Sequence, residues 1–305
     1  MTCSPVARRL LALVGILLWG VPGLADEPTT REDLKEPVYR VTKATPSGVQ
    51  DVPVAQAPGQ GERDAAHPLD SALEVAYTGL NHIRANVRDY TCTLVKREQI
   101  GGELLDHEYI FTKIRHPQVE NGQITVPFSV YMYFLKPDSM KGREVIYVAG
   151  ANGNKLIAHE GGWKGRVTPT VHLFPDSALA MRNNRYPITE VGIATLTQRL
   201  IEKGERDRNE GPCTVQFFKG AKINGRVCTC LQVTHAHRRP PFDFHMARIF
   251  IDDEHTVPVR YEAYDWPQPG SATPALIEEY TYMNLKFNTG LTDADFSPEN
   301  PQYNF

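Results

Sequence analysis

Short segments of alternating hydrophobic and polar residues follow one another along most of this chain. Each is rich in β-branched or aromatic residues and ends at Gly, Pro or Asn, a combination typical of β-strands joined by turns. In the first half, the pattern predicts strands at residues 90–98, 104–116, 127–137, 143–150 and 154–160. Because the connections are short, neighbouring strands are expected to run antiparallel.

The same pattern returns after residue 212. Strands are expected there at residues 213–222, 226–235, 247–252, 256–266 and 276–288. The first two surround Ile223-Asn224-Gly225, and Asn-Gly is a strong signal for a two-residue hairpin loop. The C-terminal part of the chain is therefore expected to continue one antiparallel sheet.

Two stretches show helical spacing instead. Before the first strand, apolar residues three or four apart from Leu73 to Val87 predict an amphipathic helix capped by Asp70 or Ser71. Between residues 175 and 204, Thr189 is expected to cap a second helix that ends at Gly204. Each helix would turn its apolar face toward the sheet.

These elements predict a mainly β fold of the α+β class. About ten antiparallel strands make a long sheet, which must curl, close or be covered because exposed edges invite aggregation. We therefore expect a strongly curved antiparallel sheet or an incomplete β-barrel of about ten strands. The N-terminal helix and the mid-chain helices are expected to cover one side of it.

The N-terminus has the features of an export signal. Arg8 and Arg9 precede an apolar run from Leu10 to Leu18, and a small-residue cleavage site follows. The run is shorter than the roughly 20 residues that a membrane span needs. We predict a signal peptide over residues 1–25 and no transmembrane segment in the mature chain. The protein is then expected in the periplasm or the cell exterior, which use the same signal.

The rest of the chain divides by composition. Residues 26–68 are rich in Pro, Thr, Gly and charged residues, which predicts a disordered tether. Residues 69–305 suffice for one β domain. Loss of Arg8 and Arg9 reduces 33 Lys and Arg to 31 against 36 Asp and Glu, so the net charge changes from −3 to −5. This argues against nucleic-acid binding, which needs clustered positive charge. The oligomeric state stays open.

Four cysteines follow the predicted signal peptide: Cys92, Cys213, Cys228 and Cys230. An even number in an exported chain allows two disulfides. Their pairing stays open, because Cys228 and Cys230 are too close to bond comfortably, and the predicted hairpin brings Cys213 opposite Ala236. A single close pair with C-x-C spacing is not the pattern of a zinc ribbon.

One segment concentrates groups with potential chemistry. His235 and His237 could share a strand face and bind a metal, with His245, His255 or Asp243 as a third ligand. Arg238 and Arg239 argue against a cation at that place. The two arginines, with His235 and His237, could instead contact an anion such as a lipid head group or a partner's carboxylate. The remaining alternative is a polar loop between two strands.

The sequence lacks the common catalytic motifs, including G-x-S-x-G, the phosphate loop and H-E-x-x-H. Glu278 and Glu279 are adjacent but lie on opposite faces of a predicted strand. An inward Glu279 would need a cation such as Arg260, since buried charges are generally paired. We therefore expect neither enzymatic activity nor a cofactor.

Large apolar and aromatic residues on the strands are the candidates for a binding function. If the barrel is incompletely filled, those that face inward would line an apolar cavity; otherwise they form an ordinary core. Strict alternation in the last strand would put Met283, Leu285 and Phe287 on one face. The candidate cavity residues are Tyr131, Tyr133, Phe250, Tyr261, Met283, Leu285 and Phe287.

Several segments resemble a known family. They are GREVIYVAG, NRYPITEVGI, INGRVCTCLQVTH, ARIFIDDEHTVPVRYEAYDWP and the closing EEYTYMNLKFNTGLTDADFSPENPQYNF. Through them, roughly residues 70–305 resemble a bacterial secreted family, domain of unknown function 1571, which has no established activity. More distantly, the order of elements resembles the LolA-like periplasmic lipoprotein carriers. That resemblance implies a bent, incompletely closed barrel with a helical lid over an apolar cavity.

The residues and the resemblance together favour one hypothesis. The chain would be an exported, non-enzymatic carrier that holds a lipid or an acylated protein in an apolar cavity. Two alternatives stay open: a metal-dependent hydrolase that uses His235 and His237, and a structural envelope protein with a filled barrel. A filled interior would favour the structural protein, and imidazoles that point apart would oppose the hydrolase.

Overall fold

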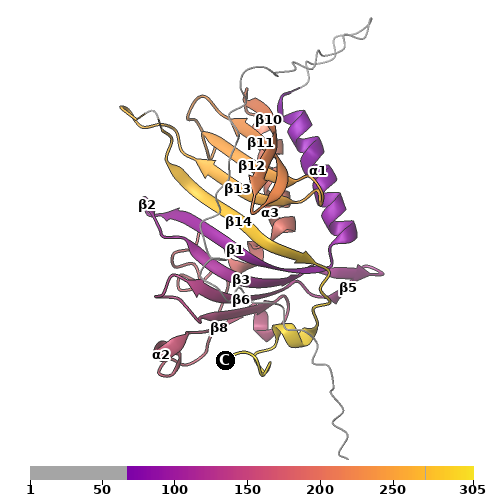
Figure 1. The fold of residues 1–305 in the computed structure, drawn as a ribbon, viewed down its shortest axis with the longest axis vertical. Coiled ribbons are helices and arrows are strands. Elements are labelled where there is room, and N and C mark those ends of the chain that lie inside the picture. The colour runs from indigo at the N-terminus through magenta and orange to yellow at the C-terminus, as the bar shows by residue number, and fades with distance from the viewer. Residues whose placement is uncertain (1–66, 272) are drawn as a thin grey trace, which may run out of the picture. The chain divides into compact units, whose positions relative to one another are not determined.

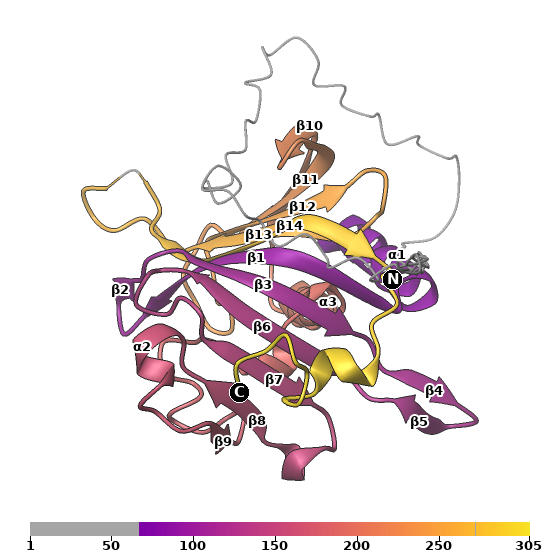
Figure 2. The ribbon, with the colours of Figure 1, turned by 60° about the horizontal axis from the view of Figure 1, so that its bottom comes forward.

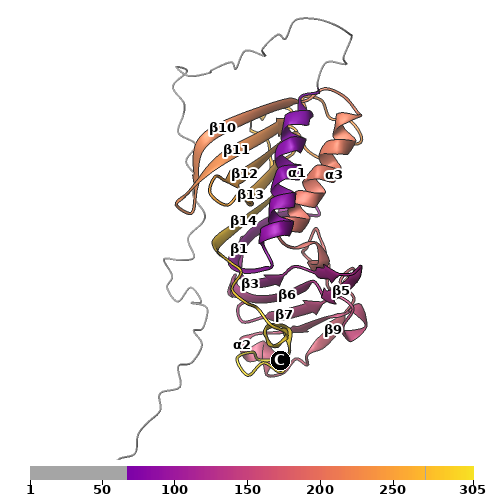
Figure 3. The same cartoon turned by 90° about the vertical axis from the view of Figure 1, so that its right-hand side faces the viewer.

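The structure is a computed structural model that describes residues 67–271 and 273–305. The predicted signal peptide, residues 1–25, lies outside the described residues, and so does the predicted tether, residues 26–68, apart from its last two residues. The described part consists of one long antiparallel sheet with two long helices on one side of it (Figures 1 and 3).

The main sheet has twelve strands in the order β10-β11-β12-β13-β14-β1-β3-β6-β7-β8-β9, with β2 paired to β1. The strands are β1 (Asp89–Ile100), β2 (Glu103–Leu104), β3 (Glu108–Arg115), β6 (Ser129–Lys136), β7 (Glu144–Val148), β8 (Leu156–His159), β9 (Val171–Leu173), β10 (Thr214–Ile223), β11 (Arg226–Thr234), β12 (Met246–Asp252), β13 (Pro258–Tyr264) and β14 (Leu276–Phe287). A separate hairpin contains β4 (Gln118–Glu120) and β5 (Gln123–Val126). The number of strands exceeds the predicted ten because the additional strands are only two to four residues long, too short to be recognised by alternation.

The sheet is curved and open. β10 and β9 stand at the two ends of the strand order and do not pair with each other. Figure 2 shows the successive strands turning from β10 at one end to β9 at the other. The prediction of a strongly curved antiparallel sheet, with an N-terminal helix and mid-chain helical structure on one side, is confirmed.

The long helices are α1 (Leu69–Asn86) and α3 (Ile193–Arg208), which lie side by side across β11 to β13 (Figure 3). They approach closely at Gly204, where an added Cβ would lie 2.9 Å from Cδ2 of Leu73. Shorter helical turns are α2 (Gly162–Gly165), η1 (Asn152–Asn154), η2 (Ile188–Glu190) and η3 (Asp293–Phe296).

The predicted helix ends were wrong in three places. α1 begins after Pro68, and no side chain caps it; the Asp70 carboxylate accepts a bond from the backbone N–H of His67 instead. Thr189 belongs to η2, and α3 begins after Gly192, whose φ of 115° favours glycine. Gly204 does not end α3, because it provides room for α1 and the helix continues to Arg208.

Bulges account for two differences from the predicted registers. The Asn224-Gly225 hairpin is confirmed, since Ile223 pairs with Arg226. A bulge between Phe218 and Ala221 then shifts the register by one residue, so Thr214 pairs with Thr234. Cys213 is therefore brought opposite His235 and not Ala236.

A second bulge interrupts the last strand. The register between β1 and β14 shifts between Thr91 and Thr93, and Asn284 adopts a φ of 53°. Leu285 and Phe287 consequently pack in the same core as Tyr282, whereas Met283 pairs with Thr93 on the opposite face. The prediction that Met283, Leu285 and Phe287 share a face was wrong, because strict alternation does not survive a bulge.

The C-terminal tail packs against the outer face of the sheet. Tyr303 stacks on Tyr131 with ring centroids 4.0 Å apart, and the Asn304 side-chain amide donates to Glu144 at 2.9 Å. Lys113 forms an ion pair with Asp295 at 2.9 Å. These contacts fasten the tail across β3, β6 and β7, on the face opposite to α1 and α3.

All four cysteines of the described part are free thiols, and three of them are buried. Burial raises the pKa of Cys228 and of Cys230 to about 12. Burial likewise raises the pKa of Cys213 to about 11. The thiolates that disulfide exchange requires are therefore disfavoured at these positions.

Candidate ligand-binding cavity

The curved sheet has two halves that are filled to different degrees. We call β11 to β13 with α1 and α3 the helix-covered half. We call β1, β3 and β6 to β9 the open half; residues 175–191, the cover segment, lie over it. The two cavities described below occupy these halves, and α3 contributes Leu200 and Lys203 to the lining of both.

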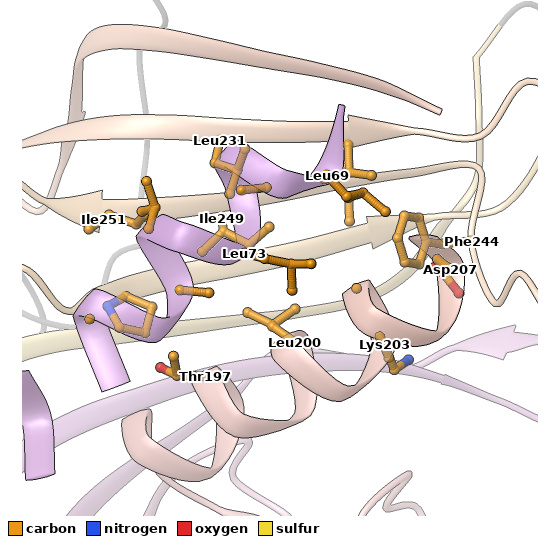
Figure 4. A pocket seen from close by; sticks show the side chains of 18 of the residues that line it. Leu69, Leu73, Thr197, Leu200, Lys203, Asp207, Leu231, Phe244, Ile249 and Ile251 are labelled. Atoms are coloured by element: carbon orange, nitrogen blue, oxygen red, sulfur yellow. The ribbon is translucent and has the colours of Figure 1, made fainter. Parts of the chain in front are cut away.

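The helix-covered half is nearly filled. A gap of about 80 Å³ remains between the two long helices and the strands (Figure 4). Leucines and isoleucines of both helices and of the sheet converge on it, among them Leu69, Leu73, Leu200, Leu231 and Ile249. A water molecule takes up about 30 Å³ of liquid volume, so a gap of this size has room for a few water molecules but not for a long organic ligand.

The open half encloses a cavity of about 1080 Å³. Its floor is formed by alternate residues of the strands, which point to the same face of the sheet. They include Leu94 of β1, Ile110 of β3, Met132 and Phe134 of β6, Val145 of β7 and Leu156 of β8. The opposite wall comes from α3 and the cover segment, through Leu196, Leu179, Ala180 and Ile188. The cavity exceeds the roughly 300–1,000 Å³ of most small-molecule sites.

One end of this cavity is polar. Lys96 of β1 is buried and forms ion pairs with Glu98 at 3.2 Å and with Glu108 at 3.4 Å. Its ammonium group also donates to the side chain of Asn184 in the cover segment at 2.7 Å. Burial raises the pKa of Glu108, although the charge of Lys96 opposes that shift. A charged group thus lies next to an apolar interior.

A second set of polar contacts fastens the cover segment to β14. Arg185 Nε donates to Glu278 at 2.9 Å, and the Tyr186 hydroxyl donates to the other oxygen of Glu278 at 3.1 Å. The backbone N–H of Arg185 donates to Glu98 at 3.1 Å, and the Tyr280 hydroxyl donates to the same carboxylate. Burial, together with the charge of Glu278, raises the pKa of Tyr280. These groups, with Lys96 and Asn184, form what we call the polar clasp.

The seven predicted cavity residues lie in different places. Tyr261 lines the large cavity and is buried. Leu285 and Phe287 pack in the core near Tyr90 and His255, away from the cavity lining. The remaining four lie on the other face of the sheet or in the core. Tyr131 lies under the C-terminal tail, and Tyr133 pairs with Glu144 of β7. Met283 pairs with Thr93 of β1, and the fully buried Phe250 pairs with Cys230 of β11.

The predicted head-group residues lie away from the large cavity. His235 is fully buried, stacks on Phe242 and faces Asp207 at 3.6 Å. Arg238 forms an ion pair with Asp265, and Arg239 donates to the backbone carbonyl of Glu210. His237 is exposed. None of these four side chains lines either of the two cavities.

The metal alternative is not supported by the described residues. His245 turns its Nδ1 toward the backbone carbonyl of His235 at 2.8 Å, while the His235 ring faces Asp207. Within residues 67–271 and 273–305, no group of three or more His, Cys, Asp or Glu side chains could hold a metal ion. The imidazoles therefore do not converge on one point.

The adjacent glutamates have separate partners, as their strand positions predicted. Glu279 lies on the outer face, where it contacts Arg260 and also accepts a bond from His107 at 2.8 Å. Burial opposes its ionisation, yet His107 and Arg260 together lower the pKa of Glu279. Glu278 points to the other face, into the polar clasp. A cation such as Arg260 was expected for an inward Glu279; the contact with Arg260 is present, but on the outer face.

The polar clasp was missed at the sequence level, although β1 contains a signal for it. Leu94, Lys96 and Glu98 share one strand face, and that face changes from apolar to charged along the strand. Such a change within a strand that lies in the middle of a sheet indicates a polar site. Its partners in the cover segment could not be identified, because that segment has no periodic pattern.

The fold and the cavity together define a class: a single open, curved antiparallel sheet with a large cavity on its concave, covered side. The model of a family described as "Protein of unknown function (DUF1571)" matches residues 87–305. The chain belongs to this family, as its sequence resemblance predicted. A comparison with curated proteins found no match.

Solved structures of other proteins show a limited likeness. The Mycobacterium tuberculosis lipoprotein LppX is 13% identical, over 73% of this chain and 98% of its own, with a TM-score of 0.40. A DUF1329 family protein from Desulfovibrio piger is 13% identical, over 76% and 98%, with a TM-score of 0.37. A putative outer membrane lipoprotein-sorting protein domain from Vibrio parahaemolyticus is 15% identical, over 74% and 95%, with a TM-score of 0.34. At these values the likeness transfers no function to this chain.

No helix within residues 67–271 and 273–305 is long and apolar enough to cross a membrane.

Proposed function

We propose that this protein is a carrier that binds an elongated apolar ligand, such as the acyl chain of a lipid or of an acylated protein, in the large cavity. The observation that carries the proposal is the cavity of about 1080 Å³, with an apolar floor and a polar end. Burial of each acyl methylene group would contribute about 0.8 kcal/mol, so a long chain offsets the cost of binding.

The polar clasp supports a specific orientation of the ligand. Acyl chains end in a polar group, which needs hydrogen-bond partners when it leaves water. Lys96 and Glu108 are two of the charged groups that line the cavity, and they lie next to the apolar residues Leu94 and Ile110 on the same faces of β1 and β3. In this proposal the chain lies against Leu94, Ile110 and Phe134, and its polar end reaches the clasp.

The predicted signal peptide over residues 1–25 fits a carrier that works in the periplasm or the cell exterior. We propose binding without chemical conversion of the ligand.

Titration with a dansyl-labelled undecanoic acid tests the proposal. Ala158 lines the cavity from β8, and its neighbour Ile157 points to the other face of the same strand. Ala158→Phe should weaken binding of the probe at least tenfold, because the new ring occupies the space of the acyl chain. Ile157→Phe is the matched control and should retain the wild-type affinity. Equal affinity of the two variants, or no binding by the wild type, would reject the proposal.

A further inference from the structure

Exposed apolar residues gather at the rim of the large cavity. Trp163, Val167, Phe174 and Leu179 are 52–73% exposed, an unusual state for large apolar side chains. Leu179 itself lines the cavity, and each of the other three adjoins a residue that does: Lys164, Thr168 and Leu173. We call these four residues the apolar rim.

The apolar rim is interleaved with positive charge. Residues 161–182 contain Lys164, Arg166 and Arg182 but one acidic residue, Asp176, whereas the whole chain has a net charge of −3. Lys155 lies over the ring of Phe174, with its ammonium group 5.0 Å from the ring centroid. The net charge of residues 161–182, which contain the apolar rim, is therefore positive, whereas that of the whole chain is negative.

We propose that the apolar rim docks this protein on the surface of a membrane that contains anionic lipids. The inference rests on the proposed carrier function and adds the place where the ligand enters and leaves. A bilayer surface has an outer head-group region and an apolar region beneath it. A tryptophan and aliphatic side chains suit the apolar region, and the flanking Lys and Arg suit the head groups. The apolar side chains enter the acyl boundary, and the cations remain among anionic head groups.

The position of the rim determines where the cavity entrance lies when the protein is docked. Because Leu179 belongs to both the rim and the cavity lining, a docked protein would hold its cavity entrance against the lipid. An acyl chain could then move between the bilayer and the cavity without crossing water. α2, which carries Trp163, lies near β8 at the same end of the sheet (Figures 1 and 2).

Co-sedimentation with vesicles tests the inference. The mature protein should partition onto vesicles of phosphatidylglycerol and phosphatidylcholine, and much less onto pure phosphatidylcholine. The double variant Trp163→Ser/Val167→Ser should lose at least tenfold in partitioning. The matched control is Val119→Ser/Ile124→Ser in the β4–β5 hairpin, whose side chains are 60% and 68% exposed but lie elsewhere. This control should partition as the wild type does.

The outcomes separate this inference from the carrier function. Neither double variant alters a residue of the cavity lining, so both should bind the dansyl-labelled fatty acid normally without vesicles. Normal fatty-acid binding without vesicle partitioning by the wild type overturns the docking and leaves the carrier function intact. Vesicle partitioning without fatty-acid binding overturns the carrier function alone. Equal losses in the two double variants, or equal partitioning onto both kinds of vesicle, also overturn the docking.

Discussion

The two halves of one curved sheet differ in how their inner face is covered. In the helix-covered half, α1 and α3 pack closely enough to leave about 80 Å³. In the open half, the cover segment leaves about 1080 Å³. The strands of both halves present apolar residues such as Ile249 and Ile110 to the interior, but the strands of the open half add Lys96, Glu98 and Glu108. The cover and this polar row together distinguish the large cavity from the filled core.

The two covers are also held by different interactions. α1 and α3 pack through apolar side chains, with Gly204 providing the necessary close approach to Leu73, and exposed polar contacts such as Tyr77–Glu205 and Arg208–Asp70 add to this packing. The cover segment is held at its end by the polar clasp, through Asn184, Arg185 and Tyr186. Opening of the cover segment returns these polar groups to water, which replaces their hydrogen bonds, whereas separation of the helices exposes apolar surface for which water offers no such replacement. The cover segment can therefore open at a lower cost than the helices can separate.

The largest expected difference concerns two leucines of equal burial. Leu73 and Leu156 are both 6% exposed, but Leu73 packs between helices and Leu156 borders the large cavity. Leu73→Ala should reduce the free energy of unfolding by about 3 kcal/mol, and Leu156→Ala by about 1 kcal/mol, because the second removes fewer contacts. Urea denaturation of both variants measures this. Equal losses would show that the open half is filled in solution.

Enlargement of an alanine in each half should give a contrast in the same direction, by overpacking in place of truncation. Ala247 on β12 is 1% exposed and lies under the helices, whereas Ala158 on β8 faces the large cavity. Ala247→Phe should destabilise the fold by about 2 kcal/mol through overpacking. Ala158→Phe should change stability by less than about 0.5 kcal/mol, because free space accepts the ring. A large loss in Ala158→Phe, measured by the same denaturation, would contradict the cavity.

Removal of one clasp contact should loosen the cover segment alone. Arg185→Gln removes the charged guanidinium that donates to Glu278 and should reduce the opening free energy of residues 184–191 by about 1.5 kcal/mol. Hydrogen exchange of those amides reports this opening. Arg182→Gln changes an exposed neighbour and is the control. Unchanged exchange in Arg185→Gln would mean that the clasp does not hold the segment.

Acid should affect one buried group from each half in opposite directions. Burial lowers the pKa of His235 from 6.5, and the charges of Arg206 and His245 act in the same direction, while Asp207 and the backbone carbonyl of Phe244 oppose the shift. The unfolded chain then binds the proton more readily, so this contribution to stability is lost as the pH falls below about 6.5. Burial raises the pKa of Glu108 from 4.5, so its contribution is present at low pH and is lost as the pH rises through the raised value.

Thermal unfolding across this pH range separates the two groups. His235→Phe should flatten the loss of stability between about pH 7 and pH 5, while the exposed His237→Phe should retain the wild-type curve. Glu108→Gln should remove the opposite dependence at lower pH. Identical curves for His235→Phe and the wild type would show that burial of His235 does not govern this range.

The regular elements were predictable, whereas the irregular ones were not. The hairpin at Asn224-Gly225 and the face of α1 follow from turn chemistry and helical spacing, which act over a few residues. The bulge at Asn284 depends on pairing with β1, about 190 residues away, so alternation alone assigned Met283 to the wrong face. Similarly, Lys96 could be seen to interrupt an apolar face, but its partner Asn184 could not be found without the fold.

The most direct test is native mass spectrometry of the mature protein isolated from the periplasm or medium of the cells that export it. If the large cavity holds an acyl ligand, the wild type should show a non-covalent mass increment that dissociates as a lipid or an acylated peptide. Ala158→Phe should lose this increment, and Ile157→Phe should retain it. A wild-type protein that is always bare, and that takes up no added fatty acid, would contradict the carrier function.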